Sequence, residues 1–225
     1  MSTLSKKQKI IQEKLDTEKS YTLDEAMSII QSVKSEKFDE SLDISIKLGV
    51  DPDKSDQNVR GAVTLPNSLG KDVKVAVFAD GDHASKAESV NAEYVGMEDL
   101  AEKFQKEEIE VDVVISTNAA MKVVGKLGQT LGPKGLMPNP KTGTVTADTA
   151  KAVKEVKAGR VEYKIDKTAN MHVPVGKVSF DADKLSDNVK ALIDAVLKSK
   201  PSSSKGSFIL TCTLTATMSP AISLD

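Results

Sequence analysis

Two changes of hydrophobic pattern along the chain constrain its fold most strongly. Between residues 72 and 157, short apolar segments alternate with amphipathic helical segments. This pattern predicts strands at 73–77, 94–95 and 111–116, and helices at 84–90, 98–106 and 148–158, the last N-capped by Thr146 or Asp148. Strands that alternate with helices form a parallel sheet covered by helices, so this region is predicted to be an α/β layer.

The segments on both sides of this region alternate apolar and polar residues, which is typical of half-buried strands. Such strands are predicted at 42–48, 161–165, 171–175 and 207–218, and helices at 6–14, 22–33 and 183–198. Thr22 and Glu25 have the spacing of a capping box at the start of the second helix. Because each strand needs partners for its apolar face, we expect one discontinuous α+β domain, residues 1–67 and 159–225, with residues 68–158 inserted.

Composition places the chain among ordinary globular proteins. Of its 225 residues, 39% are hydrophobic and 28% are charged. No apolar run approaches the ~18 residues of a membrane span, and the N-terminal segment lacks the apolar core of a secretory signal, so we expect a cytoplasmic protein. Cys212 is the only cysteine, which excludes an internal disulfide, and its pattern position predicts that it lies in the core.

The segment from Met121 to Val145 is rich in glycine, proline and lysine and contains no acidic residue. Proline fixes φ and glycine permits positive φ, so the segment is predicted to be a shaped loop rather than a helix or strand. Its lysines are Lys122, Lys126, Lys134 and Lys141. A shaped cationic loop can hold phosphate oxygens, although a solvated surface loop has the same composition.

Charge is distributed unevenly along the chain. The formal net charge is −2, but residues 122–177 hold 11 lysines and arginines against four acidic residues, which gives +7 there and −9 elsewhere. A protein with one cationic side can bind a polyanion despite an acidic total. Aromatic residues make up 4% and tryptophan is absent, so a bound RNA is expected to be structured rather than single-stranded.

The sequence contains no pattern that predicts catalysis, a cofactor or a metal site. No glycine–lysine pair has the rest of a phosphate-binding Walker loop. The calcium-like run that begins at Asp51 has Asp56 where the loop needs glycine. His83 and His172 are far apart and have no ligand-spaced partners.

The last predicted strand places a row of hydroxyls on one face. Residues 207, 209, 211, 213, 215 and 217 face one way, and the apolar residues 208, 210, 212, 214, 216 and 218 face the other. Threonine is a common residue on solvated strand faces. The same row can instead hydrogen-bond the sugars and phosphates of RNA.

Four long segments resemble the family of bacterial large-subunit ribosomal protein L-one. The first is LGPKGLMPNPKTGTV, in the Gly/Pro/Lys segment. The other three are SEKFDESLDISIKLGVDPDKSDQNVRGAVTLPNSLGK at 35–71, AGRVEYKIDKTANMHVPVGKVSF at 158–180, and KGSFILTCTLTATMSP at 205–220. The resemblance implies a discontinuous α+β domain with an inserted Rossmann-like three-layer α/β domain. It also implies a non-enzymatic protein, a monomer when free, that binds the stalk region of 23S rRNA in the large subunit.

The resemblance further implies that the protein assists release of deacylated tRNA from the exit site and represses translation of its own messenger. The residues that match the family's RNA contacts are Phe38, Ser41, Asp43, Lys47, Thr211, Thr213, Thr215, Thr217, Met218 and Ser219. We expect Lys167, Thr168 and His172 to extend the same surface. Ser219 replaces the family's glycine. By pattern alone, Phe38 is a core aromatic.

Two other interpretations remain open from the sequence. One is an α/β enzyme or binding module for a phosphorylated ligand at the Gly/Pro/Lys loop, and the other is a protein–protein scaffold. The resemblance places the RNA surface on the discontinuous domain, although that domain has 19 basic and 19 acidic residues. Contacts to the RNA minor groove through shape and hydroxyls need little net charge.

Overall fold

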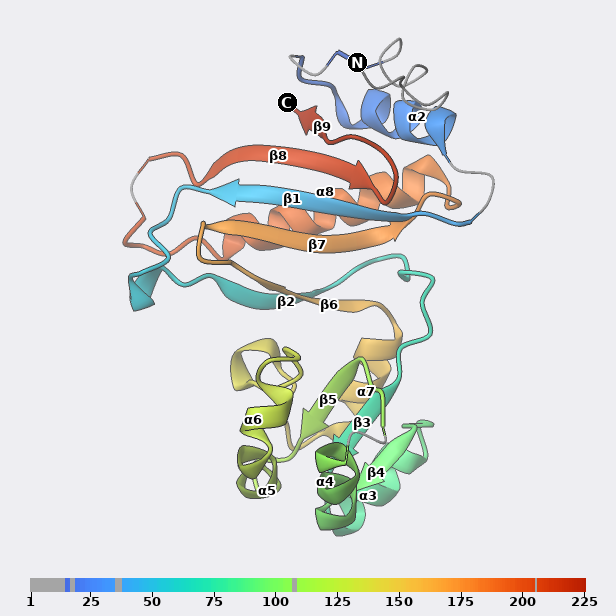
Figure 1. Ribbon diagram of the computed structural model, residues 1–225, viewed down its shortest axis with the longest axis vertical. Helices are drawn as coiled ribbons and strands as arrows, with labels where there is room; N and C mark the ends of the chain where they lie inside the picture. The colour runs from blue at the N-terminus through green and yellow to red at the C-terminus, as the bar shows by residue number, and fades with distance from the viewer. Residues whose placement is uncertain (1–14, 17–18, 35–37, 107–108, 205) are drawn as a thin grey trace, which may run out of the picture. The chain divides into compact units, whose positions relative to one another are not determined.

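The computed structural model describes residues 15–16, 19–34, 38–106, 109–204 and 206–225 (Figure 1). The chain divides into a split unit, Met1–Gly70 with Val161–Asp225, and an inserted unit, Lys71–Arg160. The predicted first helix, 6–14, lies outside the described residues. The helices and strands combine α+β and α/β arrangements, as predicted.

The split unit is built on a four-stranded antiparallel sheet in the order β7-β1-β8-β9. The strands are β1 (Ser41–Leu48), β7 (Asn170–Lys177), β8 (Ile209–Ala216) and β9 (Ile222–Leu224). β2 (Arg60–Thr64) and β6 (Arg160–Lys164) form a separate two-stranded sheet, and a 3-10 helix (Ser55–Gln57) precedes β2. β1 is therefore a central strand with a partner on each side.

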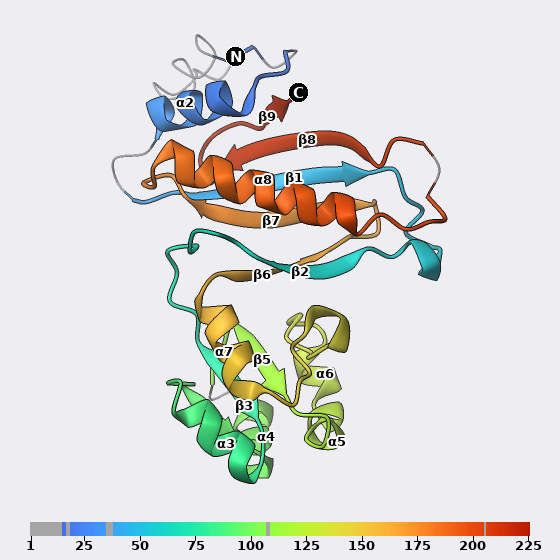
Figure 2. The same ribbon diagram turned by 180° about the vertical axis from the view of Figure 1, so that it is seen from behind.

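Helix α8 (Ala182–Lys198) covers one face of the four-stranded sheet, as the two opposite views in Figures 1 and 2 show. It buries an apolar stripe, Leu185, Val189, Leu192 and Val196, against the strands. The strands contribute the alternate residues of β1, Leu42, Ile44, Ile46 and Leu48, each at most 1% exposed. This alternation decides which face of the sheet is left open.

Helix α2 (Leu23–Val33) begins at the predicted capping box. The Thr22 hydroxyl accepts from the Glu25 backbone N–H, and the Glu25 carboxylate accepts from the Thr22 N–H at 3.0 Å. These bonds satisfy two of the N–H groups that a helix start leaves unpaired. The helix packs its buried residues into the same core as the sheet.

The inserted unit is a three-layer α/β structure around a parallel sheet in the order β4-β3-β5. Its strands are β3 (Val75–Phe78), β4 (Tyr94–Gly96) and β5 (Val113–Ser116). Its longer helices are α3 (Gly81–Glu88), α4 (Glu98–Gln105) and α7 (Thr149–Lys157), and Asp148 caps α7. Val75 and Val77 face α3 and α7, whereas Ala76 and Phe78 face α4 and two short helices, α5 (Met121–Lys126) and α6 (Gly128–Leu131).

The prediction of a loop over the whole of 121–145 is wrong. The segment contains α5 (Met121–Lys126), α6 (Gly128–Leu131) and a 3-10 turn (Pro140–Thr142). Val124, Leu127 and Leu131 recur at helical spacing and are at most 1% exposed, so their burial outweighs the cost of about 1 kcal/mol for each glycine in a helix. Irregular backbone follows at Gly132, and Gly143 has a left-handed φ of 71°.

The final predicted strand is interrupted by a bulge and ends early. The register slips between Lys47 and Leu48, which pair with Thr211 and Ile209, so Leu210 is the extra residue. Leu210 is 52% exposed instead of facing the core, and Met218 is exposed because β8 ends at Ala216. Cys212 packs against the core as predicted, and burial raises the pKa of its thiol to about 11.

Each unit has its own hydrophobic core. One cluster of buried residues lies within the split unit, and two lie within the inserted unit, one on each face of its sheet. A domain with its own core can fold without its neighbour.

We therefore expect a protein in which a short Gly/Ser linker replaces residues 71–160 to fold. It should keep the circular dichroism of a mixed α/β protein and melt in one cooperative transition. The isolated residues 71–160 form the complementary control. A non-cooperative melt of the shortened protein would show that the split unit depends on the insert.

Candidate nucleic-acid interface

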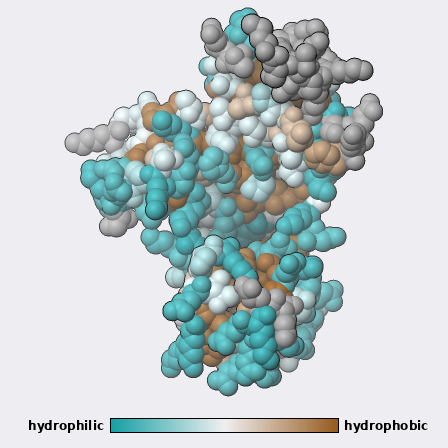
Figure 3. Space-filling model, viewed as in Figure 1, coloured by the Kyte–Doolittle hydropathy of each residue, from teal (hydrophilic) through white to brown (hydrophobic). Residues whose placement is uncertain are grey.

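The face of the four-stranded sheet opposite α8 carries a polar surface, which we call the open face. Strand pairing aligns its residues in rows: Ser45 lies between His172 and Thr213, Lys47 between Asn170 and Thr211, and Asp43 between Pro174 and Thr215. Figures 1 and 2 show no helix over this face among the described elements. The surface over β1 and β8 in Figure 3 mixes pale and teal atoms with brown ones.

The hydroxyls of threonines in β8 and just beyond its end are bonded to the backbone of β1. The hydroxyls of Thr213, Thr215 and Thr217 donate to the carbonyls of Ser45, Asp43 and Ser41, at 3.2, 3.3 and 3.4 Å. Each hydroxyl keeps acceptor capacity after this bond. The threonine row is therefore an ordered polar surface and not a set of freely rotating side chains.

Two titratable residues, Asp43 and His172, lie near each other at the centre of the open face. The Ser45 hydroxyl is 2.9 Å from Nδ1 of His172, and the tautomer of the ring sets which group donates. Burial raises the pKa of Asp43, and the nearby His172 opposes that rise. A carboxylate at this position distinguishes the open face from a simple cationic patch.

The turn between β6 and β7 extends the open face at one end. Oδ1 of Asp166 accepts hydrogen bonds from the Thr168 backbone N–H and hydroxyl, both at 2.8 Å, and from the Asn170 N–H at 2.9 Å. The bond from the Thr168 hydroxyl is the main reason that the pKa of Asp166 is lowered. The turn fixes the positions of Lys167 and Thr168, whose side chains are exposed.

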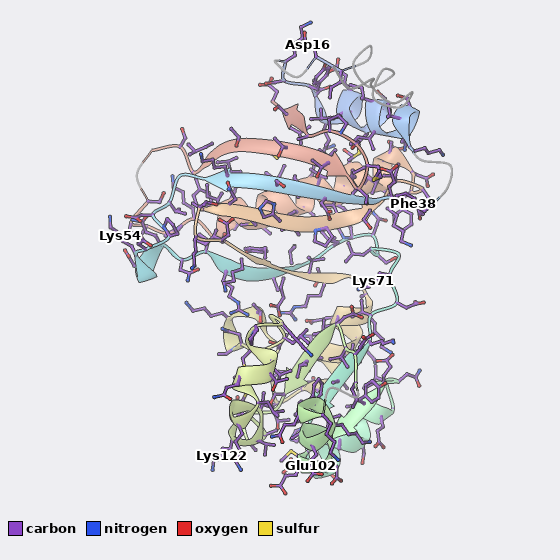
Figure 4. The ribbon with its side chains drawn as sticks, viewed as in Figure 1. Asp16, Phe38, Lys54, Lys71, Glu102 and Lys122 are labelled. Carbon is purple, nitrogen blue, oxygen red and sulfur yellow. The ribbon has the colours of Figure 1, made fainter. Side chains whose placement is uncertain are left out.

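The opposite end of the open face carries exposed apolar side chains. Phe38 is 47% exposed and Met218 is 58% exposed, so the interpretation of Phe38 as a core aromatic is wrong. Figure 4 shows Phe38 where β1 begins. The Thr217 N–H donates to the Ser41 carbonyl, and the Ser41 N–H donates to the Thr217 hydroxyl, both at 3.1 Å. These bonds join the two segments that carry Phe38 and Met218.

The buried carboxylate of Glu40 holds this end of the sheet together. Glu40 is 2% exposed, and its Oε2 accepts from the Met218 N–H at 3.1 Å. The Ser219 hydroxyl accepts from the Ala216 N–H at 2.9 Å, a bond that a glycine at this position cannot make. Sequence reasoning missed Glu40 because no pattern distinguishes a buried glutamate. It also missed Ser45 and Asn170. Strand alternation indicated them, because Ser45 lies two residues from Lys47 and Asn170 two residues from His172, on the same face.

The lysines of the Gly/Pro/Lys segment lie in the inserted unit, whereas the residues of the open face lie in the split unit. Lys122, Lys126, Lys134 and Lys141 are all exposed. Lys134 borders a cavity of about 540 Å³ whose floor includes Phe104 and Leu131. The rim mixes lysines with acids, and Nζ of Lys71 lies 2.5 Å from Oδ1 of Asp112. The Lys71 hydrogen bond lowers the pKa of Asp112.

Within the described part of the chain, no group of three or more His, Cys, Asp or Glu side chains could hold a metal ion. Of the helices that the structure describes, none has the length and apolarity that crossing a bilayer requires.

Comparison with known proteins decides the family. The model of the "Ribosomal protein L1p/L10e family" matches residues 30–220. The chain belongs to this family. It is also 52% identical over 225 residues to "Large ribosomal subunit protein uL1" of Saccharophagus degradans, an alignment that covers 100% of this chain and 97% of that protein.

Membership of the Ribosomal protein L1p/L10e family confirms the resemblance seen in the sequence. The chain is a structural ribosomal protein and not an enzyme. The alternative of an α/β enzyme acting on a phosphorylated ligand at the Gly/Pro/Lys segment is therefore wrong.

Glu40 generates a prediction about stability. Removing its carboxylate leaves the Met218 N–H without its bond, so Glu40→Ala should lower the free energy of unfolding by about 1–3 kcal/mol. Glu162→Ala is a control in the same unit, because Glu162 is exposed and forms a surface ion pair with Arg60 at 3.6 Å; such a pair contributes about 0–1 kcal/mol. Urea unfolding measures both, and equal losses would contradict a special role for Glu40.

Proposed function

We propose that the chain is a component of the large ribosomal subunit whose open face binds the stalk region of 23S rRNA. The observation that carries the proposal is the convergence of three separate segments on this face. The predicted contact residues come from β1 and the segment just before it, from β7 and the turn leading into it, and from β8 and the segment just after it. The name and identity of the relative from Saccharophagus degradans support assembly into the large subunit.

The chemistry of the open face fits structured RNA. Hydroxyl groups at regular strand spacing can contact riboses across a wide, shallow minor groove. Phe38 and Met218 are exposed at one end, where they can pack on bases or sugars. Lys47 and Lys167 are exposed cations for phosphates. The RNA-binding domain in this proposal comprises residues 1–67 and 159–225, with 68–158 as an insert.

The proposal extends to two further roles of the assembled protein. In the ribosome the stalk assists release of deacylated tRNA from the exit site. Off the ribosome, the free monomer represses translation of its own messenger in the cytoplasm. Repression needs no second site, because a messenger that copies the rRNA structure would bind the same open face. Lys122, Lys126, Lys134 and Lys141 form a secondary cationic surface in this proposal.

The exposed apolar side chains give the most direct test of the open face. Stacking on an aromatic side chain contributes about 1–3 kcal/mol per base, so the double variant Phe38→Ala, Met218→Ala should bind a stalk RNA fragment at least about tenfold more weakly. Both side chains are exposed, so the thermal melt should change little. Filter binding with the rRNA fragment and with the leader of the messenger measures the effect.

Leu197 supplies the matched control. It is 47% exposed, as Phe38 is, but lies on α8, which covers the other face of the sheet. Leu197→Ala should therefore leave the affinity for both RNAs unchanged. If Leu197→Ala weakens binding as much as the double variant does, the open face is not the RNA site.

Salt dependence tests the cations of the open face. Each phosphate contact contributes about 0.9 to the slope of log affinity against log salt concentration. Lys47→Gln should therefore reduce the slope by about 1 and weaken binding to all RNA sequences alike. Lys54→Gln is the control, because Lys54 pairs with Asp51 beyond the end of β1. A slope that Lys47→Gln leaves unaltered would remove Lys47 from the phosphate contacts.

A further inference from the structure

The hydroxyl protons at the centre of the open face point into the sheet. The oxygens of Thr213 and Thr215 lie 3.2 and 3.3 Å from the carbonyls of Ser45 and Asp43. Because a carbonyl oxygen only accepts, each hydroxyl donates its single proton there and keeps its lone pairs. These two threonines therefore present hydrogen-bond acceptors to whatever lies on the face.

Asp43 adds a carboxylate to the same part of the face. Its neighbours across the sheet are Pro174 on β7 and Thr215 on β8. Among the described residues, its carboxylate has no hydrogen-bond or ion-pair partner, and His172 is the titratable side chain that acts on it. Its half-buried position penalises the charged form, which raises its pKa. An ionised carboxylate is an acceptor only, so this group needs a donor.

Phosphate is an unsuitable occupant for this position. A phosphate offers acceptors and negative charge, both of which a carboxylate repels. The minor groove of an RNA duplex offers two donors at its surface, the guanine 2-amino group and the ribose 2′-hydroxyl. The centre of the face is therefore complementary to the groove, and exposed lysines such as Lys47 are available for the backbone.

We infer that Asp43, Thr213 and Thr215 form an acceptor strip that recognises donors in the minor groove of the bound RNA, with Asp43 on a guanine 2-amino group. The inference rests on the proposed function and names what the centre of that site reads. Asp43 thereby becomes a specificity-determining residue, even though its negative charge opposes binding of any polyanion.

The direction in which one substitution changes the affinity for RNA tests the inference. Asp43→Ala in the full-length chain removes a negative charge, so a surface that contacts phosphates would bind RNA more tightly. The acceptor strip predicts the opposite. A hydrogen bond to a charged group contributes about 1.5–3 kcal/mol, so a stalk fragment should bind about ten- to a hundredfold more weakly. Asp187→Ala, on the exposed side of α8, removes the same charge away from the face and should leave binding unchanged.

Substitution in the RNA identifies the donor. Inosine lacks the 2-amino group of guanine, so each guanine of the fragment is replaced in turn. At one position, inosine should weaken binding to the wild-type chain by about the same factor as Asp43→Ala. At that position it should have no further effect on Asp43→Ala, because the two changes remove one bond. Asp43→Asn keeps an acceptor oxygen, so its affinity for the fragment should lie between those of the wild type and Asp43→Ala. Its thermal melt should be unchanged.

The two proposals fail in different ways. If Asp43→Ala binds as well as the wild type or better, while Phe38→Ala, Met218→Ala still loses affinity, the acceptor strip is refuted and the open face remains the RNA site. If no inosine position is coupled to Asp43, the guanine assignment is refuted. If the wild-type chain does not bind the stalk fragment at all, the proposed function itself is refuted, and this inference falls with it.

Discussion

The split unit depends on the pairing of β1 with β7 on one side and β8 on the other. Ser45, at the centre of β1, bonds to His172 and to Thr213, which are 127 and 168 residues further along the chain. The entropic cost of closing such a loop grows only with the logarithm of its length. Burial of four aliphatic side chains of β1 offsets this cost. The inserted unit can lie within this loop because it buries its own core.

The same pairing creates the RNA site that we propose. In each strand taken alone, polar residues lie at alternate positions, and these residues would form an ordinary solvated face. Once the strands pair, threonine hydroxyls bond to the carbonyls of β1, and Asp43 is held among neutral neighbours beside His172. The surface thus acquires a fixed pattern of acceptors. A pattern of this kind can recognise an RNA groove without a large positive charge, which explains how a chain with a net charge of −2 fits this role.

Order at the ends of the open face comes from two carboxylates, the buried Glu40 at one end and the exposed Asp166 at the other. Glu40 ties the Met218 backbone to the start of β1, and Asp166 organises the turn before β7. These carboxylates hold backbone N–H groups in place, so the exposed side chains beside them have defined positions. Precision at a binding surface generally requires such support, because a contact that is loosely held loses its energy to side-chain entropy.

The sequence by itself determined the periodic elements. The capping box at Thr22, the alternation of β1 and the βα rhythm of the insert are local properties, and each led to the correct element. The four matching segments were also sufficient to indicate the family, which the family model then confirmed. Local pattern was sufficient here because period and capping depend on neighbouring residues.

Only the tertiary structure decided the features that depend on distant partners. The helices in the Gly/Pro/Lys segment form because Val124, Leu127 and Leu131 find an apolar sheet to cover, which outweighs their glycine neighbours. The bulge at Leu210 arises from the register with β1, and the burial of Glu40 from the end of β8. The exposure of a side chain and the direction of a hydroxyl proton depend on the groups packed around them, so the local sequence does not determine either.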